Sequence, residues 1–187
     1  MGGATLSLEY APDGVAGQLQ GNTRESAALR YAIGGLKLAA IYYNGHDTNL
    51  APDQAATGVG NNRFVYVGAL YTFRGFSVSA SYGNGRNPAR DNAIDIDLRS
   101  AGLGYRFSSF FQVTSAVYYL KDRNNGANES TAYAFGADYL FSKRTTLYGQ
   151  LGVVKNKGKM TRALAYGQPV APGMSTTAAM LGIRHVL

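Results

Sequence analysis

Five charged residues of this chain alternate with apolar neighbours in segments that are typical of extended strands. They are Arg30, Lys37, Arg106, Asp138 and Arg184. Successive side chains of a β-strand point to opposite faces, so each charge lies on the face opposite its apolar neighbours. Four cations and one carboxylate on a water-covered face attract anions and repel cations. The pattern therefore predicts electrostatic selection among small ions, not the making or breaking of bonds.

Other residues that could bind a ligand or take part in catalysis are weaker candidates for a functional site. His46 and His185 have no spacing that indicates a metal site. Asp95 and Asp97 share a face and would bind a cation only at a loop mouth, and a solvated strand end explains them more simply. We expect the Gly-Asn-Gly stretch at 83–85 to form a turn and not a phosphate-binding loop, because no helix follows it. We therefore expect no catalytic residue, no metal and no cofactor.

Composition favours a β-rich chain with an apolar surface. The 187 residues suffice for one domain, and there is no Cys for a disulfide framework. Charged residues make up 16%, against about 25% in ordinary soluble domains, whereas Gly (24), Tyr (14) and Phe (8) are plentiful. The longest apolar stretches, such as 38–43, are far shorter than the roughly 20 residues of a spanning helix. We expect no transmembrane helix, and residues 1–10 carry no visible export signal.

Period-two alternation predicts an all-β, antiparallel chain of about eleven strands. The clearest case is 76–82, where apolar residues alternate with serine. Most runs are longer than the usual strand of about 5 to 6 residues and match the roughly 9 to 11 residues that cross a bilayer at a tilt. The predicted strands are 4–11, 15–21, 25–33, 36–46, 62–73, 76–86, 94–107, 110–123, 130–141, 145–157 and 175–187.

One short pattern recurs four times: an alternating run ends in Tyr, one residue and a large apolar residue, and a tight turn then leads into a second run. The four tyrosines are 34 to 40 residues apart, which indicates repeated hairpins. Tight turns alternate with long loops, an asymmetry typical of membrane barrels, and aromatic residues at one end of every hairpin suit a lipid–water interface. The predicted aromatic girdle comprises Tyr31, Tyr71, Phe73, Tyr105, Phe107, Tyr139 and Phe141.

With the apolar residues facing lipid, the five alternating charges line a polar and net basic interior. A charge on the lipid face at the bilayer midplane costs about 2 to 4 kcal/mol, so a wet interior is favoured for them. One segment breaks the alternation, because Ile94 and Ile96 have the opposite parity from Leu103 and Tyr105. Either a bulge shifts the phase near residues 100–102, or this half of the strand extends beyond the membrane.

The Ser-Lys-Arg-Thr turn in residues 136–148 and the Gly-x-Arg-His ending in 181–187 form a fairly specific pair of motifs. The pair closely resembles the end of the trimeric general porins of β-proteobacterial outer membranes. Similar family phrases occur at 31–42, so the resemblance spans nearly the whole chain. It implies a sixteen-stranded barrel that assembles as a homotrimer and passes small hydrophilic solutes, with an inward-folded third loop that narrows the pore.

The chain departs from that family in its length and in its last residue. About eleven strands correspond to the carboxy-terminal two-thirds of such a barrel. We therefore expect residues 1–187 to be a single partial porin domain that lacks the first strands, the signal peptide and the constriction loop. Members of the family tend to end in Phe, as a signal to the outer-membrane assembly machinery. Here Leu187 takes that place, with Ile183 and His185 at alternate positions before it.

These features together predict a passive diffusion channel in the cell outer membrane, with no enzyme activity and a preference for anions. The expected partners are outer-membrane lipid and lipopolysaccharide, further copies of the chain in a homotrimer, and the assembly machinery. The net charge of +7 agrees in sign with anion preference. Much of it is expected in loops and turns, Lys155 and Lys157 among them, where it would equally meet anionic lipopolysaccharide or neighbouring subunits.

Two alternatives remain open. One is a truncated, non-conducting porin remnant, because an open sheet leaves unpaired strand edges in lipid. The other is a soluble β-sandwich or small-barrel binding module, which would be monodisperse without detergent. Aromatic residues among basic ones also occur in single-stranded nucleic acid binding. The tyrosines here cluster on the apolar phase at strand ends, so we expect no nucleic-acid partner.

Overall fold

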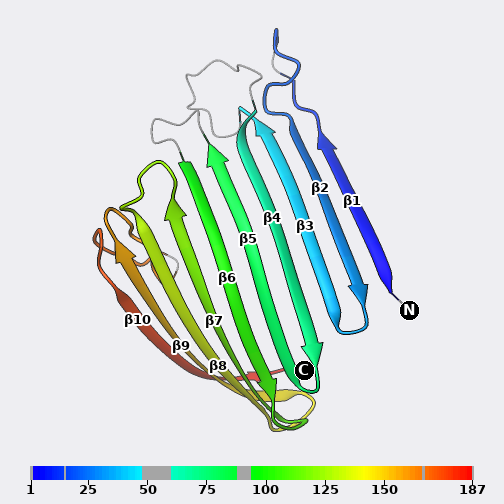
Figure 1. The fold of residues 1–187 in the computed structure, drawn as a ribbon, viewed down its shortest axis with the longest axis vertical. Helices are drawn as coiled ribbons and strands as arrows, with labels where there is room; N and C mark the ends of the chain where they lie inside the picture. The colour runs from blue at the N-terminus through cyan, green and yellow to red at the C-terminus, as the bar shows by residue number, and fades with distance from the viewer. Residues whose placement is uncertain (1, 15, 48–59, 88–93, 166, 187) are drawn as a thin grey trace. The chain divides into compact units, whose positions relative to one another are not determined.

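The computed structural model describes the chain except residues 1, 15, 48–59, 88–93, 166 and 187 (Figure 1). The described residues form ten β-strands and no helix. The strands are β1 (Gly3–Ala11), β2 (Arg24–Ile33), β3 (Leu36–His46), β4 (Gly60–Phe73), β5 (Phe76–Asn87), β6 (Ile94–Arg106), β7 (Phe111–Asp122), β8 (Glu129–Leu140), β9 (Thr145–Lys157) and β10 (Thr176–His185). None of the described segments is a helix long and apolar enough to span a membrane.

All ten strands belong to one sheet, in which each is hydrogen-bonded to its neighbours in the order β1 to β10. The pairs β1–β2, β2–β3, β7–β8, β8–β9 and β9–β10 are antiparallel. The expected all-β, antiparallel class is confirmed. The sheet divides into two compact units, with residues 1–69 and 81–97 in unit 1 and residues 70–80 and 98–187 in unit 2.

Two kinds of tight turn join the hairpins. The turns after β2 and β4 use Gly34 and Gly75 at φ angles of +54° and +86°, which glycine adopts without a steric penalty. In the turns after β6 and β8, Ser108 and Ser142 use their hydroxyl oxygens instead. Each accepts a hydrogen bond from the backbone N–H three residues on, at 3.1 Å in both cases. All four tight turns lie where the repeated Tyr pattern predicts them.

The strand expected at 15–21 is absent, and that prediction is wrong. From residue 16 onward the segment forms successive turns, in which the N–H of Gly21 donates to the carbonyl of Gln18 at 3.2 Å. Gly17 and Asn22 have φ angles of +86° and +58°, which a strand does not contain. Local turn bonds satisfy the backbone here, so a short alternation does not need a partner strand. The other ten expected strands are present.

The described chain has almost no apolar core. Val154 and Met160 are the buried hydrophobic residues among those described. Large apolar side chains along the strands are exposed instead, with Leu6 at 64%, Val78 at 53% and Phe135 at 53%. A soluble sheet would cover such a face with a second layer of structure. An uncovered apolar face is what a membrane sheet presents to lipid.

The segment with broken alternation lies in β6, which is continuous from Ile94 to Arg106. In unit 1 the Tyr82 hydroxyl donates to Asp97 at 2.8 Å, and the amide nitrogen of Asn84 donates to both Asp95 and Asp97 at 2.9 Å. Both carboxylates therefore have polar partners on the neighbouring β5. That strand continues through residues 83–85, so the turn expected there is wrong. A continuous strand with a hydrogen-bonded polar end fits the second alternative, in which this half of the strand extends beyond the apolar band.

Candidate functional site

In unit 2 the register of β7 to β10 separates side chains by size onto two faces. One face carries mostly small or polar residues. A row across the four strands is Thr114, Gly136 and Gln150, and it ends at the larger, apolar Met180. The next row, on the opposite face, is Ser115, Phe135, Leu151 and Ala179. We call these the small-residue face and the apolar face of unit 2.

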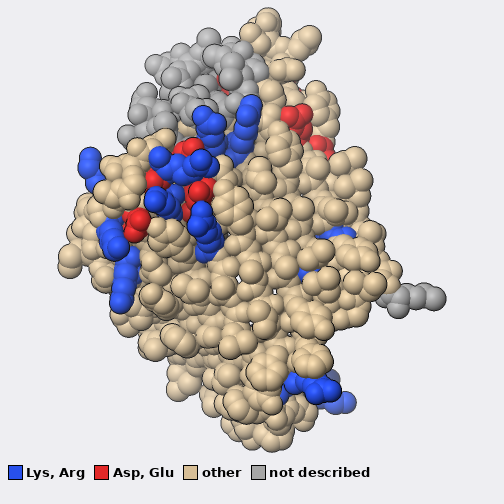
Figure 2. All heavy atoms as spheres, in the orientation of Figure 1, with Lys and Arg blue, Asp and Glu red and all other residues tan. Residues whose placement is uncertain are grey.

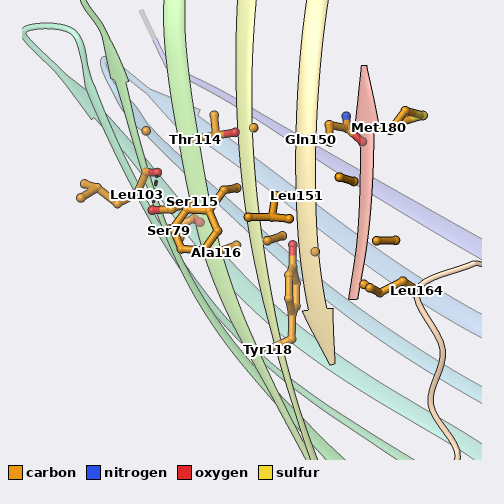
Figure 3. Close-up of a pocket in the computed structure, with 18 of the residues that line it drawn as sticks. Ser79, Leu103, Thr114, Ser115, Ala116, Tyr118, Gln150, Leu151, Leu164 and Met180 are labelled. Carbon is orange, nitrogen blue, oxygen red and sulfur yellow. Dashed lines mark hydrogen bonds between the residues drawn. The ribbon is translucent and has the colours of Figure 1, made fainter. Parts of the chain in front are cut away.

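A hollow of about 620 Å³ lies along the small-residue face (Figure 3). Glycines make room for their neighbours there, since a Cβ at Gly102 would lie 2.7 Å from the Ser79 hydroxyl, and one at Gly136 would lie 2.8 Å from the Thr114 hydroxyl. These two hydroxyls and the Gln150 amide line the hollow, and none of its described lining residues is charged. The surface of the hollow is therefore polar enough to hold water, and many of its side chains are short.

The connection between β9 and β10 folds over part of this hollow. Leu164 approaches so closely that a Cβ at Gly152 would lie 2.7 Å from its Cδ2 atom (Figure 3). The buried Asn156 holds the connection, because its amide nitrogen donates to the carbonyls of Arg162 at 2.9 Å and Met174 at 2.8 Å. Sequence reasoning did not find this contact, since a loop conformation leaves no periodic pattern.

In unit 1 the predicted charges Arg30 and Lys37 share one face. Arg30 stands opposite Thr5 on β1 and Ala39 on β3, and Lys37 stands opposite Ala32, two residues from Arg30 along β2. Both side chains are exposed. The register thus brings two cations together on the face opposite the apolar residues of these strands.

In unit 2 the predicted charges Asp138 and Arg184 lie on the small-residue face. Asp138 stands opposite Gln112, whose amide donates to it at 2.9 Å, and Arg184 stands opposite Thr146. Arg106 is the last residue of β6 and has the parity of the glycines of this face. Each of the five predicted charges lies within a few residues of the tight-turn end of its strand. In unit 2 the hollow beyond them is neutral.

The chain matches known proteins in sequence and in fold. A family model described as Gram-negative porin matches residues 1–159. The chain belongs to the Gram-negative porin family. This confirms the resemblance that the turn and ending motifs carried. The porin chain is accordingly an outer-membrane protein of the transmembrane β-barrel class.

Solved structures of porins and of another outer-membrane protein share this fold at low sequence identity. The anion-selective porin from Comamonas acidovorans aligns with a TM-score of 0.78 and 20% identity, over 99% of this chain and 56% of that one. The trimer form of Vibrio cholerae OmpT gives 0.65 and 17%, over 87% and 56%. A porin refined at 1.8 Å resolution gives 0.57 and 19%, over 98% and 57%. The chain therefore spans little more than half the length of these structures. No curated protein sequence matched it.

The predicted aromatic girdle of the porin chain lies beside the tight turns. In unit 2 its rings pair as Tyr71 with Phe73, Tyr105 with Phe107 and Tyr139 with Phe141, at centroid distances of 6.4, 4.7 and 5.1 Å. In unit 1, Tyr31 stands opposite Leu38 on the apolar side of the hairpin. The position of these rings at a lipid–water interface stays a prediction.

Two of the three residues of the predicted assembly signal lie on the apolar face of β10. Ile183 stands opposite Leu147 and is 68% exposed. His185 stands opposite Thr145, whose hydroxyl oxygen is 2.9 Å from the imidazole Nδ1. Leu187 lies outside the described residues. Both described side chains are accessible, and their use as a signal stays a prediction.

The apolar face of unit 2 carries a charged row at the loop ends of β7, β8 and β9. Lys121, Glu129 and Lys157 stand directly opposite one another there. Lys155 and Lys157 belong to β9 and not to a loop, which corrects the expectation from the sequence. The sequence contained the information for this strand placement, because both lysines alternate in phase with Leu151 in the same run.

The described residues offer no metal centre. No group of three or more His, Cys, Asp or Glu side chains among them is placed to hold a metal ion. In unit 1, the His46 Nε2 atom lies 3.0 Å from the amide nitrogen of Asn44 and 3.9 Å from a carboxylate oxygen of Glu25. This polar group stands at the loop ends of β2 and β3.

Proposed function

We propose that the chain supplies part of the wall of a water-filled outer-membrane channel, through which small hydrophilic solutes and ions diffuse passively. The observation that carries the proposal is the division of β7 to β10 into a face of small and polar side chains and a face of exposed apolar ones. Porin barrels place polar residues inward and apolar residues outward by this alternation. A wide barrel encloses water because its interior is not filled by side chains.

The proposal assigns the chain to a larger barrel as a single, partial porin domain. Closure of the sheet matters, since unpaired N–H and C=O groups in lipid cost several kcal/mol each. The chain spans 56% of the Comamonas porin, so further strands from elsewhere would complete such a barrel. One of the solved Vibrio cholerae OmpT structures is a trimer form, and we propose a homotrimer for this chain as well. Insertion would use the assembly machinery through Ile183, His185 and Leu187.

We further propose that the channel prefers anions. Arg30 and Lys37 in unit 1, and Arg106 and Arg184 against Asp138 in unit 2, give the wall a net positive charge near its tight turns. Charges on the wall of a pore tune which ions pass. The Comamonas relative is named as an anion-selective porin, which agrees in sign with this charge pattern. No catalytic step is needed, and we propose no enzyme activity.

Planar-bilayer recording of the completed barrel that contains these 187 residues tests the proposal. Stepwise conductance with a reversal potential that favours chloride over potassium is the expected result. Replacing Arg30, Lys37, Arg106 and Arg184 with Gln should lower that preference, whereas Asp138→Asn should raise it. A folded, inserted barrel without conductance steps would contradict the channel proposal. Cation preference in the unmodified chain would contradict the selectivity proposal alone.

A further inference from the structure

A flat apolar floor crosses the small-residue face of unit 2. The register of β7 to β10 places four small residues side by side in one row: Ala116, Ala134, Gly152 and Ala178. No side chain in this row is larger than a methyl group, and all four residues line the hollow. Because neighbouring strands lie about 4.8 Å apart, the row spans about 14 Å. The hollow therefore has a smooth floor of C–H groups.

Polar groups stand along the edge of this floor that is nearer the tight turns. The adjacent row of the same face contains the Thr114 hydroxyl and the Gln150 amide, and both side chains are exposed. The Ser79 hydroxyl also lines the hollow, beside Gly102. A hydroxyl both donates and accepts hydrogen bonds, and a primary amide has two donors and an acceptor oxygen. This edge can therefore bond several hydroxyl groups of one solute.

Larger side chains stand at the other edge of the floor. Tyr118 lies in the adjacent row toward the long loops and is 40% exposed. Figure 3 shows Tyr118 and Leu164 toward one end of the hollow, with the polar edge toward the other. Asn156 holds the connection that carries Leu164, because its amide nitrogen donates to two backbone carbonyls of that connection. An aromatic ring and an anchored apolar side chain therefore partly enclose the floor.

The hollow lies outside the charged groups of unit 2. None of the described residues that line it is charged, and Asp138 and Arg184 stand nearer the tight turns on the same face. Figure 2 shows charged side chains in groups on the face that it draws, with broad stretches free of charge between them. A charged solute would lose hydration in the hollow without gaining an ion pair, and a wholly apolar solute would leave the polar edge unpaired. The lining therefore favours a neutral solute with both hydroxyls and apolar C–H faces.

We infer that the hollow is a binding subsite for neutral sugars inside the channel. A pyranose ring has apolar C–H faces and carries its hydroxyls around its edge. One face of the ring rests on the floor, and Leu164 and Tyr118 contact its other side. Its hydroxyls bond to Thr114 and Gln150. The volume of about 620 Å³ is in the range of ligand pockets, about 300 to 1,000 Å³. The subsite rests on the proposed function, since it selects among the solutes that the channel admits.

Saturation-transfer NMR of glucose with the completed barrel that contains this chain tests the subsite. The barrel is held in a detergent without a sugar headgroup, so binding is measured whether or not the barrel conducts. The double variant Thr114→Val, Gln150→Ala should raise the dissociation constant of glucose about tenfold, because two hydrogen-bonding side chains are lost. Cyclohexanol, an apolar ring with one hydroxyl, should bind more weakly than glucose.

The double variant Thr5→Val, Gln20→Ala is the matched control. It makes the same two changes at exposed residues of unit 1, outside the hollow, and should leave the dissociation constant unchanged. Leu164→Ala should raise that constant several-fold, since the apolar contact with the ring is lost. Leu164→Met keeps an apolar side chain there and should restore most of the affinity. Circular dichroism of each variant checks that the sheet has formed.

Several results would overturn the inference. They are unchanged glucose binding in the double variant of the hollow, an equal loss in the control variant, tighter binding of cyclohexanol than of glucose, and equal losses in Leu164→Met and Leu164→Ala. Glucose binding by a barrel that shows no conductance steps in a planar bilayer would contradict the channel proposal alone. Conductance steps without glucose binding would contradict the subsite alone.

Discussion

Strands β7, β8 and β9 place different chemistry at their two ends on one and the same face. At the tight-turn end, Phe111 stands opposite Tyr139, whose ring centroid is 5.1 Å from that of Phe141. At the loop end, Lys121, Glu129 and Lys157 form a charged row. The strands, the face and the register are shared, so only position along the strand differs. The two ends of this apolar face therefore differ chemically, with rings at one end and charges at the other. A sheet in an asymmetric membrane requires such a difference, because the two sides of that membrane differ.

The largest expected effect comes from moving the charge of the loop end into the middle of the apolar face. Leu151→Lys places an ammonium group halfway along β9, where Leu151 is 44% exposed. We expect the free energy of unfolding from lipid vesicles to fall by about 2 to 4 kcal/mol, the cost of a lysine at the bilayer midplane. Guanidinium titration of the reconstituted chain measures it.

Thr131→Lys is the matched control for that substitution. Thr131 is on the same face of β8, opposite Lys155 and near the loop end. The same added charge should cost less than about 1 kcal/mol there, because the cost falls toward the interface. Equal losses at both positions would remove the difference between the middle and the loop end of the face.

A smaller effect is expected from loosening the loop end. Asn156→Ala removes the amide that bonds the carbonyls of Arg162 and Met174 and leaves both groups without that donor. The free energy of unfolding should fall by about 1 to 3 kcal/mol. Limited proteolysis should cut the β9–β10 connection faster. Gln168→Ala in the same connection, an exposed side chain, should change neither quantity.

The aromatic end should respond more weakly than the buried Asn156. Tyr139→Leu keeps an apolar side chain but removes the ring contacts to Phe110, at 5.5 Å, and to Phe141, at 5.1 Å. Such pairs contribute about 0.5 to 1.5 kcal/mol beyond burial, so the free energy of unfolding should fall by about 1 kcal/mol. A loss no larger than that of Tyr118→Leu, the same change on the small-residue face, would show that the contacts contribute nothing.

The smallest effect on stability is expected at the charged row itself. Lys157→Gln breaks an ion pair whose lysine is 73% exposed. Exposed pairs contribute about 0 to 1 kcal/mol, so guanidinium unfolding should barely change. A loss above about 2 kcal/mol would instead make the row part of the framework.

Much of the sheet is predictable from the sequence, because alternation is a local signal. Phe76 to Tyr82 specifies its two faces without any tertiary information. The four tight turns follow from Gly34, Gly75, Ser108 and Ser142, whose conformations or hydroxyls close a turn locally. The failure at 15–21 has the same origin, since a brief alternation cannot show whether a partner strand lies beside it.

The candidate site is less predictable, because it depends on register and on loop contacts. The sequence shows that Arg30 and Lys37 each lie opposite the apolar residues of their own strand. Their placement on one common face required the pairing of β2 with β3. The neutral hollow of unit 2 depends on Gly102 lying against Ser79 on another strand. The contact of Leu164 with Gly152 comes from a loop, for which no sequence period exists.

Water accessibility of two adjacent residues tests the central claim most directly. Gln150 and Leu151 follow each other on β9 and lie on opposite faces. Both are exposed in the structure, so only a covering of lipid can make their accessibility to water differ. The chain has no native Cys, which permits single-cysteine variants. In lipid vesicles, a charged thiol reagent should modify Gln150→Cys and spare Leu151→Cys, while both should react in denaturant. Equal labelling in vesicles, or labelling of Leu151→Cys alone, would contradict a water-lined small-residue face and a lipid-covered apolar face.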